Sequence, residues 1–310
     1  MAIRSTLGLR TASISIFLFL SSYGFGQAQT IKIALLTSLS GPFTPWGIQV
    51  RDGMKLAVSE INAAGGVNGR QLELVERDDR NNASNAITAF KYLVEREGDV
   101  AAGGIISSDV ALAVAREAES QQVPVFMTMG GTEKALTTKS RYTFRTCLPA
   151  APMSVDYLAT LIKTEKYTRV GVIVGDYAWG HSIREAIERM MAQVPDIKLQ
   201  IDVAPVGERD FTPYLRKLQA FDPELLIALG HPPGSLTITR QAIELGMKGQ
   251  IIGPWYPTEF TVQRIGEQMF GRFVDYSCVD FESAAFQDLA AKYHAATKRL
   301  ITTRFPGTRS

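Results

Sequence analysis

Apolar residues along this chain alternate between short continuous runs and longer stretches in which they recur every three to four positions. The first example lies at residues 31–79, where an apolar run at 31–36 precedes a helical pattern that begins near Gly47. Gly65-Gly66 ends the predicted helix, because glycine tolerates the left-handed conformation at a helix C-terminus. A second run at 72–75 follows, so the segment is predicted to form a βαβ unit of a parallel sheet.

The same alternation continues along the chain. Further strands are predicted at residues 100–106, 123–127, 169–174, 199–203, 225–229, 250–252 and 273–279. Helices are predicted at residues 86–94, 110–121, 153–164, 183–191, 212–220, 236–245 and 286–297. Strands that alternate with helices favour an α/β fold with parallel sheets. The chain is longer than one hydrophobic core usually covers, so two lobes are expected.

The first 28 residues have the pattern of an export signal. Arg4 and Arg10 form a basic region, an apolar core follows at residues 14–20, and small residues precede a predicted cleavage after Ala28. An uncleaved anchor is the alternative, but the apolar core is too short to span a bilayer. Cleavage leaves as many basic as acidic residues, so no nucleic-acid partner is expected. The signal predicts export from the cytoplasm.

The chain offers no recognisable catalytic or metal-binding motif. It contains no GxSxG, HExxH or P-loop sequence, so no catalytic residue, metal or cofactor is predicted. Its two cysteines, Cys147 and Cys278, are far apart and lack metal-type spacing. An export compartment permits a disulfide between them, but two unpaired thiols are the prediction. His181, in the helical segment that contains residues 183–191, and His294, in the predicted helix at 286–297, are expected at the surface.

Candidate ligand-binding residues lie where predicted strands end, because open parallel sheets bind ligands beyond those carboxyl ends. The candidates are Trp46, Ser107, Ser108, Gly130, Gly131, Thr132, Tyr177, Trp179 and His231. Hydroxyl groups at helix N-termini suit a carboxylate. Trp46 and Trp179, predicted in loops, suit an apolar or aromatic ligand body.

Each of these candidates also has a simpler structural interpretation. Ser107 and Ser108 could cap the following helix, as serine commonly does. The tryptophans could belong to the hydrophobic core. Asp78-Asp79 is interpreted as a solvated strand end rather than a catalytic or metal-binding pair.

Several sequence motifs together resemble those of a known family. They are TSLSGP at 37–42, Trp46-Gly47, EIN at 60–62, GGVNGR at 65–70, Asp78-Asp79 and YAWG at 177–180. On these motifs the chain resembles the type I periplasmic binding proteins, specifically the branched-chain amino acid (Leu/Ile/Val-binding) group that feeds ABC importers. The resemblance runs from about residue 31 to residue 297.

The resemblance implies two Rossmann-like lobes with parallel sheets, joined by a three-segment hinge that closes on ligand. The first lobe would span 29–146, the second 147–275, with a return to the first at 276–297 and a disordered tail at 298–310. The family would continue beyond this point, so the C-terminus looks truncated.

The resemblance also assigns roles to residues. Ser107 matches the serine that binds the ligand carboxylate. Gly130 and Thr132 match its further partners, and Trp46 and Trp179 match aromatic positions that line the pocket. Pro233 stands where relatives that bind amino acids carry an acidic residue for the ammonium, which opens other carboxylates, including aromatic ones, as ligands.

The expected function is therefore that of a periplasmic solute-binding protein. Its partners would be a small carboxylate, either an amino acid or another acid, and an ABC permease in the inner membrane. A ligand-sensing subunit of a signalling system is the alternative, and a periplasmic enzyme is the third possibility.

Overall fold

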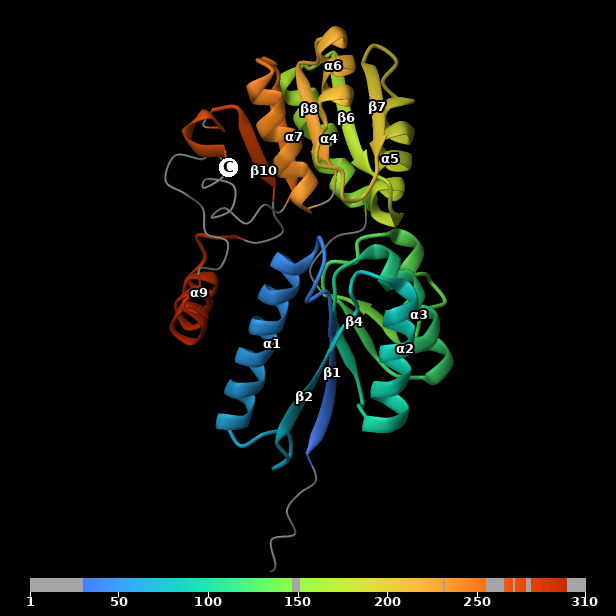
Figure 1. Cartoon of the computed structure of the whole chain (residues 1–310), viewed down its shortest axis with the longest axis vertical. Coiled ribbons are helices and arrows are strands. Elements are labelled where there is room, and N and C mark those ends of the chain that lie inside the picture. Colours follow the sequence, from blue (N-terminus) through green and yellow to red (C-terminus); the bar gives the residue numbers. More distant parts are fainter. Residues whose placement is uncertain are drawn as a thin grey trace, which may run out of the picture.

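The computed structural model describes residues 30–146, 151–230, 232–254, 265–269, 271–276 and 280–299, and contains two parallel β-sheets stacked end to end (Figure 1). The elements associated with the first sheet are β1 (Ile31–Thr37), α1 (Thr44–Ala63), β2 (Leu72–Asp78), α2 (Ala83–Tyr92), the π-helical turn η1 (Leu93–Glu97), β3 (Ala102–Ile105), α3 (Ser108–Gln121), β4 (Val125–Met127), the 3-10 turn η2 (Glu133–Ala135) and β5 (Thr143–Arg145).

The second sheet follows without interruption by elements of the first. Its elements are α4 (Ala151–Glu165), β6 (Arg169–Gly175), α5 (Ala178–Met191), β7 (Lys198–Ala204), α6 (Thr212–Phe221), β8 (Leu225–Leu229), α7 (Pro232–Glu244), β9 (Gln250–Pro254), the 3-10 turn η3 (Gly266–Met269) and β10 (Phe273–Tyr276). The final described helix, α9 (Ala284–Thr297), returns to lie beside α1 of the first lobe (Figure 1).

The two sheets share one topology. Their strand orders are β2-β1-β3-β4-β5 and β7-β6-β8-β9-β10, and every pairing is parallel. In each sheet the order reverses beside the first strand, between β1 and β3 and between β6 and β8. Crossover connections leave that point on opposite faces of the sheet, so the loops beyond it are splayed and leave room for a ligand.

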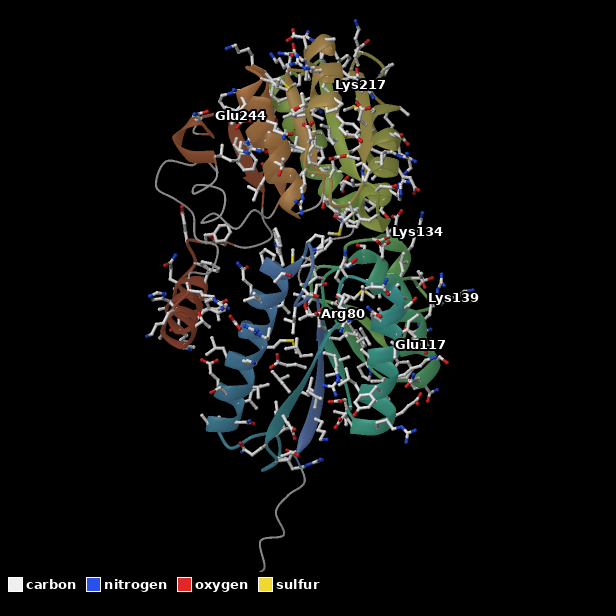
Figure 2. The ribbon with its side chains drawn as sticks, in the orientation of Figure 1. Arg80, Glu117, Lys134, Lys139, Lys217 and Glu244 are labelled. Atoms are coloured by element: carbon white, nitrogen blue, oxygen red, sulfur yellow. The ribbon has the colours of Figure 1, made fainter. Side chains whose placement is uncertain are left out.

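Helices cover both faces of the sheets. In the first lobe α2 and α3 pack together on one face and α1 lies on the other, and in the second lobe α4 pairs with α5 and α6 with α7. Charged side chains such as Lys217 and Glu244 project from the outer surface (Figure 2). Apolar residues fill the layers between helix and sheet, for example Phe90 of α2 and Phe211 at the start of α6, both fully buried.

The predicted fold class is confirmed, and each predicted strand and helix has a counterpart. Most of these helices begin two or more residues before the apolar pattern indicated, for example α1 at Thr44, α5 at Ala178 and α7 at Pro232. Part of one sheet face is apolar and open to solvent, because Phe126 and Phe144 stack at 5.2 Å between ring centroids while 40% and 44% exposed.

Some predictions fall on residues outside the described ranges. They are the signal peptide at 1–28, the cysteines Cys147 and Cys278, the candidate His231 and most of the tail at 298–310. Within the described ranges, no helix combines the length and the apolar character needed to cross a membrane.

Candidate functional site: the boundary between the lobes

The carboxyl ends of the strands in the two sheets face each other. The ring centroid of Phe43, between β1 and α1, lies 6.0 Å from that of Tyr177, which follows β6. Asp109, near the start of α3, accepts a 3.1 Å hydrogen bond from the backbone N–H of Ala178, the first residue of α5. Since ligands of such sheets bind beyond the carboxyl ends, the space between the lobes is the candidate site.

The two candidate tryptophans lie in helices, so their predicted placement in loops is wrong. Trp46 and Trp179 sit in the first turns of α1 and α5, and each is only 6% exposed. The glycine after each explains why the helix can begin so close to the preceding strand. A Cβ on Gly47 or Gly180 would lie 1.8 Å or 1.9 Å from a carbonyl oxygen at the strand end.

An aromatic cluster joins the lobes. Tyr177 is 9% exposed, and its ring centroid lies 6.2 Å from that of Trp179. Phe43, Trp46 and Ile106 of the first lobe belong to the same buried cluster. Burial raises the pKa of the Tyr177 hydroxyl, and the nearby negative charge of Asp109 raises it further. The phenol is therefore neutral, so this part of the boundary between the lobes consists of uncharged aromatic rings.

Ser107 is buried, and its hydroxyl is not used by any residue in the described ranges. The residue is the N-cap of α3 and is 1% exposed, yet its side chain makes no capping hydrogen bond. Its Oγ has no hydrogen-bond partner among the described residues. The capping interpretation of Ser107 therefore fails, and its hydroxyl is free to bind a ligand at a helix N-terminus.

Ser108 has a different role from Ser107. Its Oγ accepts a 3.2 Å hydrogen bond from the backbone N–H of Thr132, so it ties the start of α3 to the loop after β4. Both serines are 1% exposed. Ser108 thus fixes the position of the neighbouring candidate loop.

The loop Gly130–Thr132 is held against both lobes. A Cβ on Gly130 would lie 2.7 Å from the Cβ of Ala111, so this loop packs directly on α3. The carbonyl of Gly131 accepts a 3.1 Å hydrogen bond from the N–H of Ala151, the first residue of α4. The Thr132 hydroxyl lies 2.8 Å from the hydroxyl of Ser182 on α5. All three candidates in this loop are buried at the boundary between the lobes.

Helix α5 carries most of the described polar contacts between the lobes. Besides the Asp109–Ala178 and Thr132–Ser182 hydrogen bonds, Lys134 pairs with Glu185 at 3.3 Å. Glu133 and Arg189 lie 3.7 Å apart. The ion pairs are exposed and contribute little, whereas Ser182 is fully buried. Sequence reasoning missed Asp109 and Ser182, and only their proximity to Ser108 and Trp179 in the chain could have indicated them.

The double aspartate after β2 is structural, and its interpretation as a solvated strand end is wrong for Asp79. Asp79 is fully buried and accepts a 2.6 Å hydrogen bond from Ser38 Oγ. Burial raises the pKa of Asp79. Burial also acts to raise the pKa of Asp78, but hydrogen bonds from Ser40 Oγ and the N–H groups of Arg80, Leu39 and Ser40 outweigh it and lower that pKa. The pair braces the loop that leads to Trp46.

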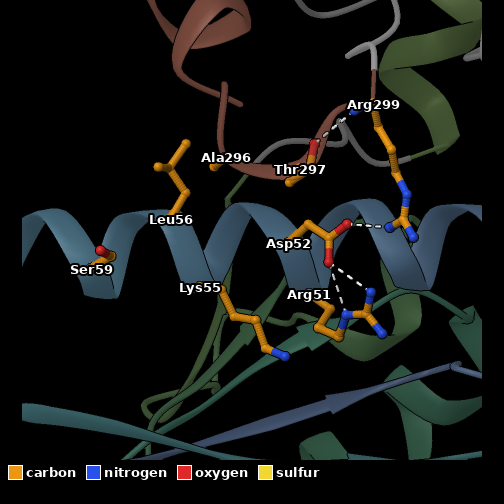
Figure 3. A pocket seen from close by; sticks show the side chains of 8 residues that line it. All are labelled: Arg51, Asp52, Lys55, Leu56, Ser59, Ala296, Thr297 and Arg299. Atoms are coloured by element: carbon orange, nitrogen blue, oxygen red, sulfur yellow. Dashed lines mark hydrogen bonds and ion pairs between the residues drawn. The ribbon is translucent and has the colours of Figure 1, made fainter. Parts of the chain in front are cut away.

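A cavity of about 350 Å³ lies away from the boundary between the lobes, between α1 and α9 (Figure 3). It is lined by Arg51, Asp52, Lys55, Leu56, Ser59, Ala296, Thr297 and Arg299. Asp52 pairs with both Arg51 and Arg299, and Lys55 pairs with Glu76, so the charges there are largely matched within the protein. None of the predicted ligand-binding residues lines this cavity. The Asp52–Arg299 pair joins the segment after α9 to α1, and Lys292 of α9 pairs with Glu60 of α1 at 3.3 Å.

Pro233 lies in the first turn of α7, and no acidic residue occurs between Leu229 and Glu244. Two acidic residues elsewhere at the boundary between the lobes already have partners. Asp109 accepts from Ala178, and Asp176 lies 2.8 Å from His181 Nε2. Among the described residues, no group of three or more His, Cys, Asp or Glu side chains is arranged to hold a metal ion.

Comparison with known proteins identifies the family of this chain. A family model described as periplasmic binding protein matches residues 30–306. Because the match covers most of the sequence and the fold agrees, the chain belongs to the type I periplasmic binding proteins.

Its curated relatives are named for branched-chain amino acids. The leucine-specific-binding protein of Salmonella typhimurium is 25% identical over 229 residues, covering 74% of this chain and 62% of the relative. The Leu/Ile/Val-binding protein homolog 3 of Brucella melitensis is 28% identical over 242 residues, covering 76% and 64%. The match thus spans slightly less than two thirds of the length of these relatives.

Solved structures share the fold. A solute-binding protein of an ABC transporter from R. palustris, in complex with benzoate, superposes with a TM-score of 0.78 at 18% identity, covering 88% of this chain and 75% of that chain. The branched-chain amino acid transporter substrate-binding protein of Streptococcus pneumoniae, in complex with isoleucine, gives a TM-score of 0.75 at 23% identity, covering 88% and 78%.

Proposed function

We propose that the protein binds a small carboxylate between its lobes and delivers it to an ABC permease in the inner membrane. Relatives of the same family are binding proteins named for branched-chain amino acids, which supports a transport role. The proposed location is the periplasm, after cleavage of the export signal near Ala28. The proposal needs no catalytic residue, metal or cofactor.

The observation that carries the proposal is the unused hydroxyl of Ser107. A buried polar group without a partner is costly, so such a group usually has a ligand or another role. Ser107 Oγ lies at the N-terminus of α3, where exposed amides and the helix dipole favour an anion. A carboxylate oxygen is the ligand group that satisfies both features. Gly130, Gly131 and Thr132 flank this point and complete the proposed anion site.

Hinged closure is the proposed mechanism. The chain crosses from the first lobe to the second after β5 and returns between β10 and α9, which is consistent with lobes at 29–146, 147–275 and 276–297. The contacts of α5 with α3 and with the loop after β4 would form on closing. Ligand bound between the lobes would shift the population toward this closed form by adding contacts to both sides.

The proposed ligand is an aromatic or aliphatic acid rather than an α-amino acid. Trp46, Tyr177 and Trp179 supply an apolar wall for the ligand body. An ammonium group would need a carboxylate partner, because a buried cation without one is costly. The loop after β8 carries no acidic residue, Asp109 binds the N-terminus of α5, where the helix dipole is positive, and Asp176 lies beside His181.

A thermal-shift screen tests this assignment. We expect benzoate and 4-methylpentanoate to raise the unfolding midpoint by mass action, at least as much as phenylalanine and leucine do at equal concentration. Benzamide and 4-methylpentanamide are the neutral controls and should give smaller shifts. If the amino acids alone raised the midpoint, the ligand would be an α-amino acid. If no carboxylate raised it, the proposed function would be wrong.

A further inference from the structure

Arg145 is the last residue of β5, on the strand that leads from the first lobe toward the second. Its Nε donates a 3.1 Å hydrogen bond to the carbonyl oxygen of Gly130, and its Nη2 donates a 2.7 Å hydrogen bond to the carbonyl oxygen of Thr132. The guanidinium therefore binds the candidate loop at its first and last residues. Two N–H donors of a planar fork fix the orientation of both carbonyl groups.

No carboxylate that the structure describes neutralises the charge of Arg145. Its guanidinium is half-buried, and no carboxylate of the described residues lies within ion-pair distance. Burial lowers the pKa of Arg145. An arginine nevertheless stays protonated, so a positive charge with only neutral partners lies beneath the loop. Removing such a charge from water is costly unless an anion comes near it.

The same contacts determine where the loop amides point. Every peptide bond described is trans, so the N–H of Gly131 points away from the carbonyl of Gly130 that Arg145 holds. That N–H donates to no described residue. The N–H of Thr132 is instead taken up by Ser108. One amide of the loop is thus turned away from Arg145 and left available to an acceptor.

We propose that Arg145 is a positioning residue of the ligand site: it orients the Gly130–Thr132 loop so that the Gly131 amide can bind a carboxylate, and its charge gives the site its preference for anions. This inference rests on the proposed carboxylate ligand. Arg145 acts through the loop rather than by touching the ligand, and the protein distinguishes a carboxylate from the matching neutral amide through it.

Two substitutions separate the roles of charge and geometry. Arg145→Met removes both the charge and the hydrogen bonds. Arg145→Lys keeps the charge but lacks the planar guanidinium that donates two hydrogen bonds at once. Arg141→Met is the matched control, because Arg141 also donates to two backbone carbonyls, those of Thr138 and Ser140, but on an exposed turn. Calorimetry with benzoate and benzamide measures the preference for an anion. Hydrogen exchange of residues 128–135 measures how firmly the backbone of the loop is held.

We expect Arg145→Met to lower the ratio of the benzamide Kd to the benzoate Kd about tenfold, equivalent to about 1.4 kcal/mol. Arg145→Lys should retain most of that ratio while binding both ligands more weakly, and Arg141→Met should match the wild type. The loop should exchange faster in both Arg145 variants. An unchanged ratio in Arg145→Met would overturn the charge role, and unchanged exchange would overturn the positioning role.

These outcomes also separate this inference from the proposed function. If the wild-type protein binds benzoate and the variants do the same, the function stands and the Arg145 inference is wrong. If the wild type binds no carboxylate, the function is wrong and the charge role with it. Hydrogen exchange then still decides whether Arg145 holds the loop.

Discussion

At the residue scale, two kinds of position stand out: glycines with no room for a side chain, and buried polar side chains without a hydrogen-bond partner among the described residues. Gly47 and Gly180 lie where the first turns of α1 and α5 meet the ends of β1 and β6. Ser107 and Asp99 are buried with side-chain oxygens that have no partner among the described residues. The two glycines leave no room for a larger residue, whereas Ser107 and Asp99 bury polar atoms without a described partner. The two kinds of position therefore give different predictions.

Alanine at Gly47 or Gly180 should destabilise the protein by about 3 kcal/mol, because the added Cβ cannot avoid a backbone carbonyl without moving the helix. Gly53 is the control. It lies in α1, and a Cβ added there would meet no atom within 4 Å, so Gly53→Ala should be neutral or stabilise by about 0.5 to 1 kcal/mol. Urea unfolding of the three variants measures this. Equal stability of Gly47→Ala and Gly53→Ala would contradict the close approach.

Asp99 should make stability depend on pH. Burial raises the pKa of Asp99 from 3.8 to about 6, although the positive charge of Lys32 partly opposes it. Between those two values the folded state binds more protons than the unfolded state, so the free energy of unfolding falls as pH rises. Asp99→Asn removes this penalty and should stabilise the protein at pH 7.5 by about 1 to 2 kcal/mol, with the gain vanishing near pH 4.

Denaturant unfolding of Asp99→Asn at pH 7.5 and pH 4 gives the comparison. Asp210→Asn is the control, because hydrogen bonds from Thr212 lower the pKa of Asp210, so neutralising it should bring no gain at pH 7.5. A gain for Asp99→Asn that was the same at both pH values would show that the charge of Asp99 is not the cause.

Several site residues could be predicted singly, but their partners could not. Ser107 and Thr132 follow predicted strands, so topology alone placed them at the carboxyl edge. Ser182 lies inside a helical pattern, and its contact with Thr132 joins positions fifty residues apart. In the sequence, Arg145 looks like any other arginine at the end of a strand. The structure is needed to see that none of the described carboxylates pairs with it. Such pairings depend on how two lobes meet, which local spacing does not encode.

At the scale of elements, α5 decides how the lobes meet. It begins with Trp179 in the aromatic cluster, continues with Ser182 against Thr132, and has its N-terminus capped by Asp109 from the other lobe. A carboxylate at a helix N-terminus is favourable because it meets unsatisfied N–H groups and the positive end of the dipole. Asp109 therefore stabilises the contact between the lobes, which on the proposed mechanism belongs to the closed form.

Asp109→Ala should weaken ligand binding without unfolding the protein. Loss of the cap would cost the closed form about 1 kcal/mol, which raises the Kd of benzoate about fivefold. Asp109→Asn keeps an acceptor oxygen and should lose less. Calorimetry gives the affinities, and circular dichroism checks the fold. Wild-type affinity in Asp109→Ala would show that the Ala178 contact does not contribute to closure.

The apolar pattern located the elements but not the starts of helices. Pro45 stands in the first turn of α1 and Pro232 begins α7. Proline is suited to a first turn because the missing N–H has no helical partner there. In the first turns of α1 and α5, Trp46 and Trp179 stand beside glycines and other turn-forming residues, although both side chains are buried. That is why Trp46 and Trp179 were expected in loops although they lie in helices.

At the scale of the whole molecule, the repeated strand order β2-β1-β3-β4-β5 could not be derived from the pattern alone. The sequence predicted alternating strands and helices, and the motif resemblance predicted two lobes. The pairing of β1 with β3 and of β6 with β8 depends on contacts between distant residues. That pairing places two equivalent switch points opposite each other, and the proposed ligand site follows from it.

The most direct test of the account is the affinity of Ser107→Ala for a carboxylate, measured by isothermal titration calorimetry with benzoate and 4-methylpentanoate. Ser84→Ala, an exposed serine in the first turn of α2, is the matched control. The account predicts that Ser107→Ala binds more weakly by about 1 to 2 kcal/mol, through loss of a charge-assisted hydrogen bond, while Ser84→Ala matches the wild type. Identical affinity of Ser107→Ala and the wild type would contradict a carboxylate site between the lobes.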